Sequence, residues 1–289
     1  MRDLIKILIL IVPFSLLSQT RIYKGFLGKS PIELITKSYS DGVVNAIYVY
    51  SNFDTPIKID GNYKNGELIL REKTDEKLKA QLKFENFSTS QANLTGKWID
   101  AKNLKEYKIK LTKVYEFESY DKVEITSLEV LQNESTDKHY FKTIVKKDFK
   151  EILKVIGLKI FEKRTDKLIQ SFELDCDYRH FNNIYTSDYN FDNITDFSIF
   201  EFSYAGPNTS SIYFLMNPIT EKYEKADFEG NSLEFDNEKK LIYEHNQCCA
   251  GNAHMNATYK VVNNKMVLIK KKCIKYNNEK DNFEETECN

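Results

Sequence analysis

Short runs in which hydrophobic and polar residues alternate recur along most of the chain. In the run from 43 to 50, for example, Val44, Ala46 and Tyr48 alternate with their neighbours. Successive side chains of a β-strand point to opposite faces, and runs rich in aromatic and β-branched residues favour strand over helix. Asn65-Gly66, between two such runs, is a strong signal for a two-residue hairpin turn. The pattern therefore predicts a mainly β protein with antiparallel strands.

The first part of the pattern, residues 19–115, predicts an N-terminal antiparallel β domain. Short strands at this spacing are typical of a small barrel or sandwich. Trp98 is the only tryptophan of the chain, and we expect it to fill the core of this domain. The expected strands are 22–27, 31–35, 43–50, 56–59, 67–70, 80–84, 94–99 and 107–111.

Residues 116–289 predict a second antiparallel β domain, which carries a calcium loop and disulfides; a propeller-like arrangement of its sheets is one alternative. The charged segment 115–140 is expected to cross between the two domains. Hydrophobic residues then recur at helical spacing, which predicts a helix near 147–155. A hairpin is expected from 158 to 174, with its turn at 164–167. The later expected strands are 197–204, 211–216, 222–228, 232–235, 239–243, 257–262 and 266–271.

Residues 1–18 have the composition of a secretory signal peptide. Arg2 and Lys6 give a weakly positive start, an apolar run follows from Leu4 to Val12, and Ser18 is a small residue suited to cleavage. An N-terminal membrane anchor is the alternative, but this apolar run is short for a bilayer span. The sequence therefore predicts an exported protein that is soluble in the periplasm or outside the cell.

The charge balance and the catalytic motifs restrict the class of function. Lysine and arginine total 42 against 43 acidic residues, so the chain lacks the basic excess that nucleic-acid binding requires. The sequence contains no phosphate-binding glycine loop, no Gly-x-Ser-x-Gly elbow and no His-Glu-x-x-His motif. We therefore expect a non-enzymatic protein that binds a partner.

The segment DYNFDNITD, residues 188–196, places acidic and amide oxygens in the register of a short calcium loop. Calcium takes six to eight oxygen ligands, which in such loops come from alternate side chains and one backbone carbonyl. The sixth position usually adopts a left-handed conformation, and here it is Asn193, the residue type that tolerates this conformation best after glycine. An acidic surface turn without metal is the alternative. The predicted ligands are Asp188, Asn190, Asp192, Ile194 through its carbonyl, and Asp196.

All five cysteines lie in the last two-fifths of the chain, and export favours disulfides. The disulfide candidates are Cys248, Cys249, Cys273 and Cys288. Neighbouring cysteines rarely bridge each other, because the short ring strains the peptide between them. The adjacent cysteines are therefore expected to bond to separate partners, for which Cys273 and Cys288 are the candidates, and this leaves Cys176 over. The sequence does not determine the connectivity. His245 and His254 flank the adjacent pair, so a zinc site is an alternative, although the spacing matches no common zinc pattern.

The stretches DYNFDNITDFSIFEFSYAGPNTSS, EHNQCCAG and YKVVNNKMVLIKKKC follow one another between Asp188 and Cys288. In these stretches the C-terminal half resembles the calcium-binding periplasmic immunity proteins that neutralise secreted peptidoglycan hydrolases of the lysozyme type. The resemblance implies a lysozyme inhibitor with Asp188, Asn190, Asp192 and Asp196 as metal ligands. Asn193 in place of the usual glycine departs from the family pattern, as does the lack of a lipid-anchoring cysteine.

An inhibitor of this kind blocks the saccharide groove of its target with a rigid loop, and aromatic anchors supply most of the affinity. The predicted partner-binding residues are Tyr204, Asn208, Thr209, Ser210, Ser211 and Tyr213. The same residues could instead form a tight turn packed on the calcium loop. A calcium-stabilised carbohydrate- or cell-surface-binding module is the alternative function, and an enzyme acting on cell-wall glycan is the third.

Overall fold

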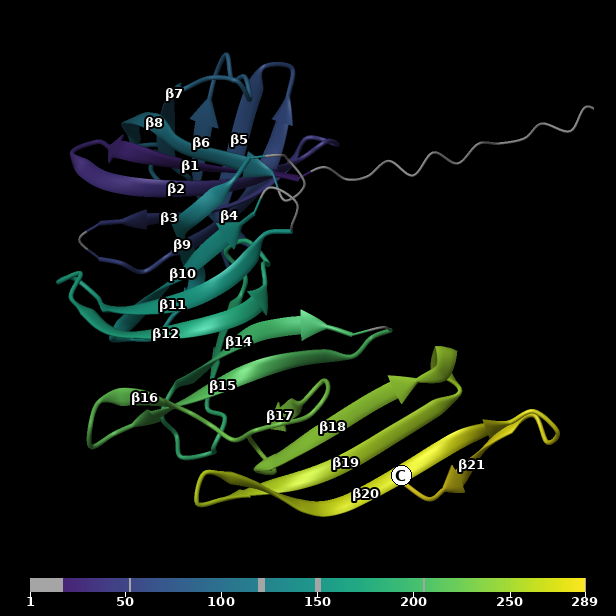
Figure 1. Ribbon diagram of the computed structural model, residues 1–289. Coiled ribbons are helices and arrows are strands. Elements are labelled where there is room, and N and C mark those ends of the chain that lie inside the picture. The colour runs from purple at the N-terminus through teal and green to yellow at the C-terminus, as the bar shows by residue number, and fades with distance from the viewer. Residues whose placement is uncertain (1–17, 52, 119–122, 149–151, 205, 289) are drawn as a thin grey trace, which may run out of the picture.

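The computed structural model describes residues 18–51, 53–118, 123–148, 152–204 and 206–288. The described residues consist almost entirely of antiparallel strands, with one short 3-10 turn. These strands form a closed barrel and three open sheets, which follow one another in a row from the barrel to the C-terminus (Figure 1). The prediction of a mainly β fold with antiparallel strands is therefore confirmed, and the sheets of the second half do not close into a propeller-like ring.

Eight consecutive strands close the barrel, because β1 (Ser18–Leu27) pairs with both β2 and β8. Within β1, Ile22 lies opposite Ile35 on one side and Tyr115 on the other. The remaining barrel strands are β2 (Ser30–Tyr39), β3 (Val43–Tyr50), β4 (Ile57–Lys64), β5 (Glu67–Thr74), β6 (Lys77–Phe84), β7 (Asn93–Asp100) and β8 (Glu106–Glu118). The Asn65-Gly66 turn joins β4 to β5 with both residues at positive φ (53° and 78°), as the hairpin signal predicts.

The inside of the barrel is a continuous hydrophobic core to which all eight strands contribute. Leu34, Leu70 and Leu82 are fully buried there, and Trp98 packs half-buried against them. Gly61 in β4 lets the chain of β5 approach closely, because a Cβ at this position would lie 1.8 Å from the carbonyl oxygen of Ile69. Alternating side chains thus fill the barrel, as in other small barrels.

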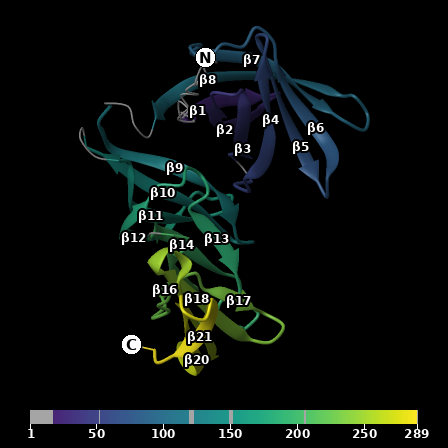
Figure 2. The same cartoon turned by 90° about the vertical axis from the view of Figure 1, so that its right-hand side faces the viewer.

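The three open sheets are built from consecutive strands. The first contains β9 (Ile125–Ser135), β10 (His139–Lys147), β11 (Lys154–Glu162) and β12 (Leu168–Asp177). The second contains β13 (Ile184–Ser187), β14 (Asp196–Ser203), β15 (Thr209–Asn217) and β16 (Lys222–Lys225). The third contains β17 (Glu234–Asp236), β18 (Leu241–Cys248), β19 (Ala253–Val262), β20 (Lys265–Asn277) and β21 (Asn282–Thr286). The 3-10 turn η1 (Cys249–Gly251) links β18 to β19, and Figure 2 shows the three sheets extending below the barrel.

A second hydrophobic core joins the outside of the barrel to the first two open sheets. It contains Ile47 of β3, Phe141 of β10 and Phe197 of β14, each fully buried. The rings of Phe141 and Phe197 lie 4.8 Å apart between centroids, and Phe197 stacks on Phe214 at 4.7 Å. This core is continuous across the predicted domain boundary at residue 115.

Two expectations are wrong for the region that follows the barrel. The segment 115–140 is not only a connection, because β8 continues to Glu118 and residues 125–135 form β9. The described part of 147–155 contains no helix, because β10 ends at Lys147 and β11 begins at Lys154; residues 149–151 lie outside the described residues. Phe141, Ile144 and Val145 lie in β10 and Ile156 lies in β11, so residues of two paired strands contribute to the apparent helical spacing.

The predicted signal peptide, residues 1–18, lies outside the described residues except for Ser18, which begins β1. Among the described residues there is no helix with the length and hydrophobicity that crossing a membrane requires.

Candidate functional site

The predicted calcium loop connects two strands of the second open sheet. β13 and β14 pair antiparallel up to Ser187 and Asp196, and residues 188–195 form the loop between them. The short strands bring Asp188 and Asp196 to the same end of the hairpin. The sheet therefore fixes the first and last predicted ligands next to each other.

Backbone N–H groups of the loop point at its own carboxylates. Asp188 accepts hydrogen bonds from the N–H of Asp192 (3.1 Å) and the N–H of Asn193 (2.7 Å). Asp192 in turn accepts from the N–H of Ile194 at 2.8 Å. Asn193 has φ 67°, so the left-handed conformation expected at the sixth position is present. The loop thus curls around its acidic side chains.

Asp196 is the buried end of this loop, with no exposed surface. Its two carboxylate oxygens accept hydrogen bonds from the N–H of Tyr189 (2.9 Å) and the N–H of Met216 (2.8 Å). Burial raises the pKa of Asp196 to about 6, and the charges of Asp192 and Asp188 act in the same direction. A buried carboxylate near two others is a group that a cation would stabilise.

The residues of the loop suit calcium by type, since they are carboxylate, amide and carbonyl oxygens. The side-chain nitrogen of Asn190, however, donates hydrogen bonds to Asp192 (2.9 Å) and to Asn264 (3.0 Å). The amide group would have to rotate before its oxygen could bind a cation beside Asp192. In the part of the chain that the structure describes, no group of three or more His, Cys, Asp and Glu side chains could hold a metal ion. Calcium binding by this loop remains a prediction.

Aromatic residues of the loop anchor it to the third open sheet. The ring of Tyr189 lies 4.7 Å from that of Phe235 and 5.0 Å from that of Tyr213. Phe191 is buried in the same cluster, and its carbonyl accepts a hydrogen bond from Lys240 at 3.2 Å. The loop therefore connects the second and third sheets by packing.

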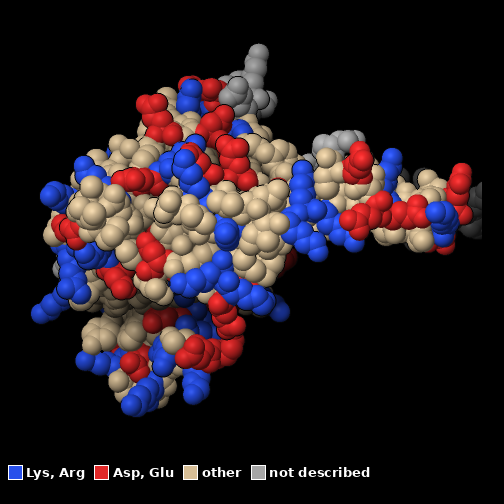
Figure 3. All heavy atoms as spheres, turned by 90° about the horizontal axis from the view of Figure 1, so that it is seen from below, with Lys and Arg blue, Asp and Glu red and all other residues tan. Residues whose placement is uncertain are grey.

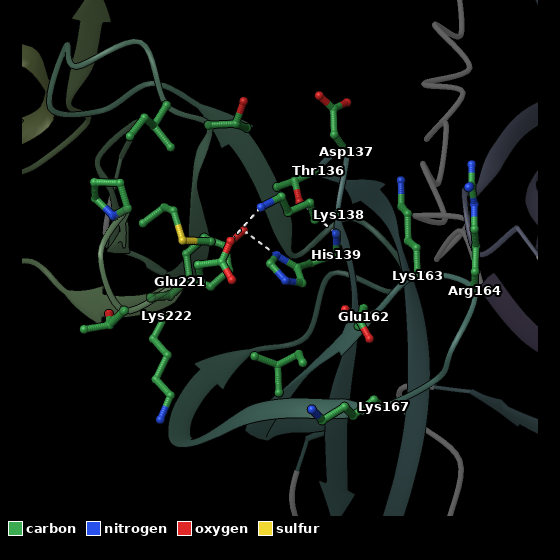
Figure 4. A pocket seen from close by; sticks show the side chains of 17 residues that line it. Thr136, Asp137, Lys138, His139, Glu162, Lys163, Arg164, Lys167, Glu221 and Lys222 are labelled. Atoms are coloured by element: carbon green, nitrogen blue, oxygen red, sulfur yellow. Dashed lines mark hydrogen bonds and ion pairs between the residues drawn. The ribbon is translucent and has the colours of Figure 1, made fainter.

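An open pocket of about 850 Å³ lies beside the loop, and Ile194 and Thr195 form part of its wall. The other walls come from the β9–β10, β11–β12 and β15–β16 turns (Figure 4). Lys138 and Glu221 form an ion pair of 2.8 Å between two of these turns. His139 is buried at the edge of the pocket, where its Nδ1 lies 3.2 Å from the Tyr223 hydroxyl and burial lowers its pKa.

The pocket is lined by more cations than acids. The positive residues are Lys138, Lys163, Arg164, Lys167 and Lys222, and the acidic residues are Asp137, Glu162 and Glu221. Within the described residues, Lys138 alone of these cations has an ion-pair partner. Burial lowers the pKa of Lys163, although Asp137 and Asp54 oppose the shift. On the face in Figure 3, cations and acids are mixed.

The predicted partner-binding residues divide into exposed and buried groups. Tyr204 is 47% exposed, and Thr209 and Ser211 are half-buried. Asn208 and Ser210 are buried, and Tyr213 is 6% exposed within the aromatic cluster that holds the loop. Tyr213 is therefore a core residue in this fold and not a surface anchor.

Asn208 has a structural role that accounts for its burial. Its amide donates to Asn246 (2.9 Å) and to the carbonyl of Gln247 (2.8 Å), while its oxygen accepts from the N–H of Gln247 (3.0 Å). Asn208 thus binds to β18 in the third sheet. Among the residues for which the alternative proposed a turn packed on the calcium loop, Tyr213 contacts that loop through the ring of Tyr189, 5.0 Å away.

The expected pairing of the cysteines is wrong. Cys273 and Cys288 are bonded to each other, which joins β20 to the end of the chain beyond β21. Their Cα atoms lie 5.3 Å apart, a distance suited to a disulfide. Cys248 and Cys249 are free and exposed, and Cys176 is free and buried.

The basic pocket was not predicted from the sequence. Its residues come from four segments between 136 and 223, which come together only when the first two sheets pack. The one local signal is EKRTDK, residues 162–167, in which three cations lie in a single turn.

Comparisons with known proteins add little to this description. No family model matches the sequence, and no curated protein is similar to it. A solved structure described as "Structure of a Xanthomonas Type IV Secretion System related protein" is similar to this chain at 11% identity and a TM-score of 0.27. The similarity covers 93% of this chain and 99% of that chain. Similarity at this level does not identify a family for the protein.

Proposed function

We propose that this protein is an exported, calcium-stabilised binding protein that inhibits a secreted peptidoglycan hydrolase of the lysozyme type. The observation that carries the proposal is the exposed basic turn between β11 and β12, which borders the pocket beside the loop. A hydrolase of this class holds two carboxyl groups across its saccharide groove. Cations on a rigid turn are complementary to such a groove, and the sequence resemblance points to the same class of partner.

Neighbouring elements hold the basic turn in place. Asp54, from the barrel, accepts a hydrogen bond from the backbone N–H of Arg164 at 2.7 Å. The Tyr140 hydroxyl of β10 donates to Asp166 at 2.6 Å. The turn itself is closed by the hydrogen bond from the N–H of Glu162 to the carbonyl of Lys167. A turn that is ordered before binding loses little conformational entropy when it enters a groove, which favours affinity.

Calcium would act on this surface indirectly. Ile194 and Thr195 belong both to the predicted metal loop and to the wall of the pocket. A cation held by Asp188 and Asp192 would fix that wall opposite the basic turn. We therefore assign calcium a structural role in forming the binding surface and no role in chemistry.

The test is inhibition of a lysozyme-type hydrolase acting on purified peptidoglycan. The protein in calcium should inhibit hydrolysis, and Arg164→Glu should weaken inhibition about 10-fold or more, because one cation of the turn becomes an acid. Lys110→Glu is the matched control, since it makes the same charge change on an exposed barrel residue far along the chain from the turn. Inhibition should be equal for this control and the unchanged protein.

Two results would contradict the proposal. The first is a folded protein that inhibits none of the tested hydrolases at micromolar concentration. The second is inhibition that Arg164→Glu and Lys110→Glu weaken to the same extent, which would show only a dependence on net charge. A Tyr204→Ala variant tests in the same assay whether the exposed part of the AGPNTSS region also contacts the partner.

One feature of the barrel favours the alternative function of carbohydrate binding. The ring of Trp98 lies 5.8 Å from that of Tyr107, which is 37% exposed, and the indole N–H of Trp98 has no partner among the described residues. Nearby, the Tyr48 hydroxyl donates to the carboxylate of Glu72 at 2.6 Å. Aromatic rings beside a carboxylate are suited to a sugar ring with its hydroxyl groups.

Because Trp98 is the only tryptophan, a fluorescence titration with soluble peptidoglycan fragments reports this binding directly; an unchanged spectrum would exclude it.

A further inference from the structure

The two adjacent cysteines lie in contact at the end of the third sheet. Cys248 is the last residue of β18, and Cys249 begins the turn η1. Their sulfur atoms are 2.8 Å apart, which is closer than two unbonded sulfur atoms pack. Both cysteines are exposed, so an oxidant can reach them from solvent.

The backbone brings these sulfurs together in an unusual conformation. Cys249 has φ 58° and Ala250 has φ 55°, left-handed values that non-glycine residues rarely adopt. Hydrogen bonds of the hairpin end hold this turn. The N–H of Asn252 donates to the carbonyl of Cys249 (3.1 Å), and Nε2 of His254 donates to the carbonyl of Gly251 (3.0 Å). Adjacent Cα atoms are only about 3.8 Å apart, shorter than the usual span of a disulfide, and this turn compensates by directing both side chains to one side.

Other partners for the two thiols are already engaged. Cys273 and Cys288 are bonded to each other, and Cys176 is buried in the core shared by the barrel and the first sheets. A zinc site would need the flanking histidines, but Nδ1 of His245 lies 2.7 Å from Asn256, and the described residues contain no group of three metal-binding side chains. For each of the two exposed thiols, the neighbouring thiol is the partner within reach.

We propose that Cys248 and Cys249 form a reversible disulfide with each other and that this bond fixes the end of the β18–β19 hairpin. The oxidant is a small-molecule disulfide or a dithiol oxidase of the exported compartment. One cysteine thiolate attacks the oxidant disulfide and releases its first thiol; the second cysteine thiolate then attacks the mixed disulfide and releases the other thiol. The protein loses two electrons and two protons, and the oxidant disulfide becomes two thiols.

The bond would act on the AGPNTSS segment through Asn208. The Asn208 side chain makes two hydrogen bonds with the backbone of Gln247, the residue immediately before Cys248. On the same segment, the carbonyl of Thr209 accepts from the N–H of Ser232 at 2.8 Å. A fixed hairpin end therefore holds the anchor of this segment in place, whether or not the segment contacts a hydrolase.

The experiment is peptide mapping after equilibration of the purified protein with oxidised glutathione, followed by alkylation and trypsin. Cleavage after Lys240 and Lys260 yields one peptide that contains both cysteines. We expect this peptide to carry no alkyl group, and its mass should be lower than that of the dithiol form by two hydrogen atoms. Mild reduction should restore two alkylation sites, and the Cys273–Cys288 cross-link identifies itself because it joins two different peptides.

Variants and a second measurement make the result decisive. In Cys249→Ser, the remaining thiol should carry glutathione, because no neighbour can displace it. In the oxidised protein, amide hydrogen exchange at Gln247 should be slower than in the reduced protein, while exchange in the barrel stays unchanged. A doubly alkylated peptide after oxidation, or a cross-link to the peptide of Cys273, of Cys288 or of another molecule, would overturn the proposal.

Discussion

Two buried ionisable side chains give this protein opposite responses to pH. His180 is 8% exposed, and its Nδ1 lies 2.9 Å from the hydroxyl of Thr20. Burial lowers the pKa of His180 to about 3, with the charge of Lys37 as a smaller cause. Burial raises the pKa of Asp196 to about 6. Each group therefore links folding to proton binding, with opposite sign.

For His180 the folded pKa lies below the unfolded value of 6.5. Between these values the unfolded chain binds more protons, so the stability due to His180 falls as the pH falls from about 6.5 toward 3. For Asp196 the folded pKa lies above the unfolded value of 3.8, so its contribution rises as the pH falls from about 6 to 4. The two effects oppose each other in the window from pH 6 to 4.

His180→Asn should separate the two effects. Asparagine suits the left-handed backbone at this position (φ 60°) and can bond to Thr20, but it does not titrate. The unfolding free energy of the unchanged protein minus that of the variant should fall by about 1.4 kcal/mol per pH unit between pH 6 and 4. Urea unfolding at several pH values measures this difference.

The control for that experiment is His245→Asn, which removes an exposed imidazole. If both variants show the same pH dependence relative to the unchanged protein, burial of His180 is not its cause.

Substitution of Asp192 tests whether the loop binds calcium. Calcium at about 100 times its Kd should stabilise the unchanged protein by about 2.7 kcal/mol. Asp192→Ala should abolish most of this increment, because the variant lacks one of the predicted carboxylate ligands. Asp192 also accepts a hydrogen bond from the N–H of Ile194, so its loss lowers stability without calcium as well. The measurement is therefore the difference in melting temperature between calcium and chelator, taken for each protein.

Glu124→Ala is the matched control for calcium, since Glu124 is an exposed acid away from the loop in sequence. Equal calcium shifts in all three proteins would show that the loop is an acidic turn without metal.

At the scale of the element, the barrel depends on close approach between neighbouring strands. In Gly61→Ala, the new Cβ would meet the carbonyl oxygen of Ile69 at 1.8 Å and the Cα of Leu70 at 2.9 Å. Both atoms belong to the backbone of β5, so they cannot rotate away. We expect a loss of about 3 kcal/mol or more, measured by thermal or urea unfolding.

Gly66→Ala separates the steric effect from the loss of a glycine. Gly66 lies in the β4–β5 turn with φ 78°, and nothing lies within 4 Å of a Cβ built there. Its substitution should lose only about 1–2 kcal/mol from the left-handed backbone. A similar loss at both positions would show that the contact with β5 is not the cause.

At the scale of the whole molecule, the barrel and the first two sheets share one core. Ile47 and Phe117 of the barrel belong to the same cluster as Phe141 and Phe197 of the sheets. The Thr20 hydroxyl of β1 also bonds to His180, which lies beyond β12. The two halves of the molecule should therefore unfold together, although the sequence pattern divides them at residue 115.

Phe141→Ala tests this coupling, because the only tryptophan lies in the barrel and Phe141 lies in β10. The substitution should lower the unfolding free energy by about 3–5 kcal/mol, since it leaves a large cavity in a packed core. Tryptophan fluorescence and far-ultraviolet circular dichroism should show the same shifted transition. A fluorescence transition that stays at its original temperature would mean that the barrel unfolds independently.

The features that depend on neighbouring residues could be predicted from the sequence. The alternation in the run from 43 to 50 is the pattern of β3, and Asn65-Gly66 forms the predicted hairpin turn. Asn193 has the left-handed backbone expected from its place in the loop. Such features follow from the period of the strand and from the steric limits on φ, which act over a few residues.

The features that join distant parts of the chain could not be predicted from the sequence, because they depend on how the strands pack. These are the closure of β1 on β8, the core across residue 115, the burial of Tyr213, the basic pocket and the bond between Cys273 and Cys288. The apolar residues of β10 and β11 show why local reasoning fails there. Apolar residues that contribute to two paired strands have the spacing of one helix in the sequence. Pairing between the strands decides between the two, because packing energy depends on which segments meet and not on their order in sequence.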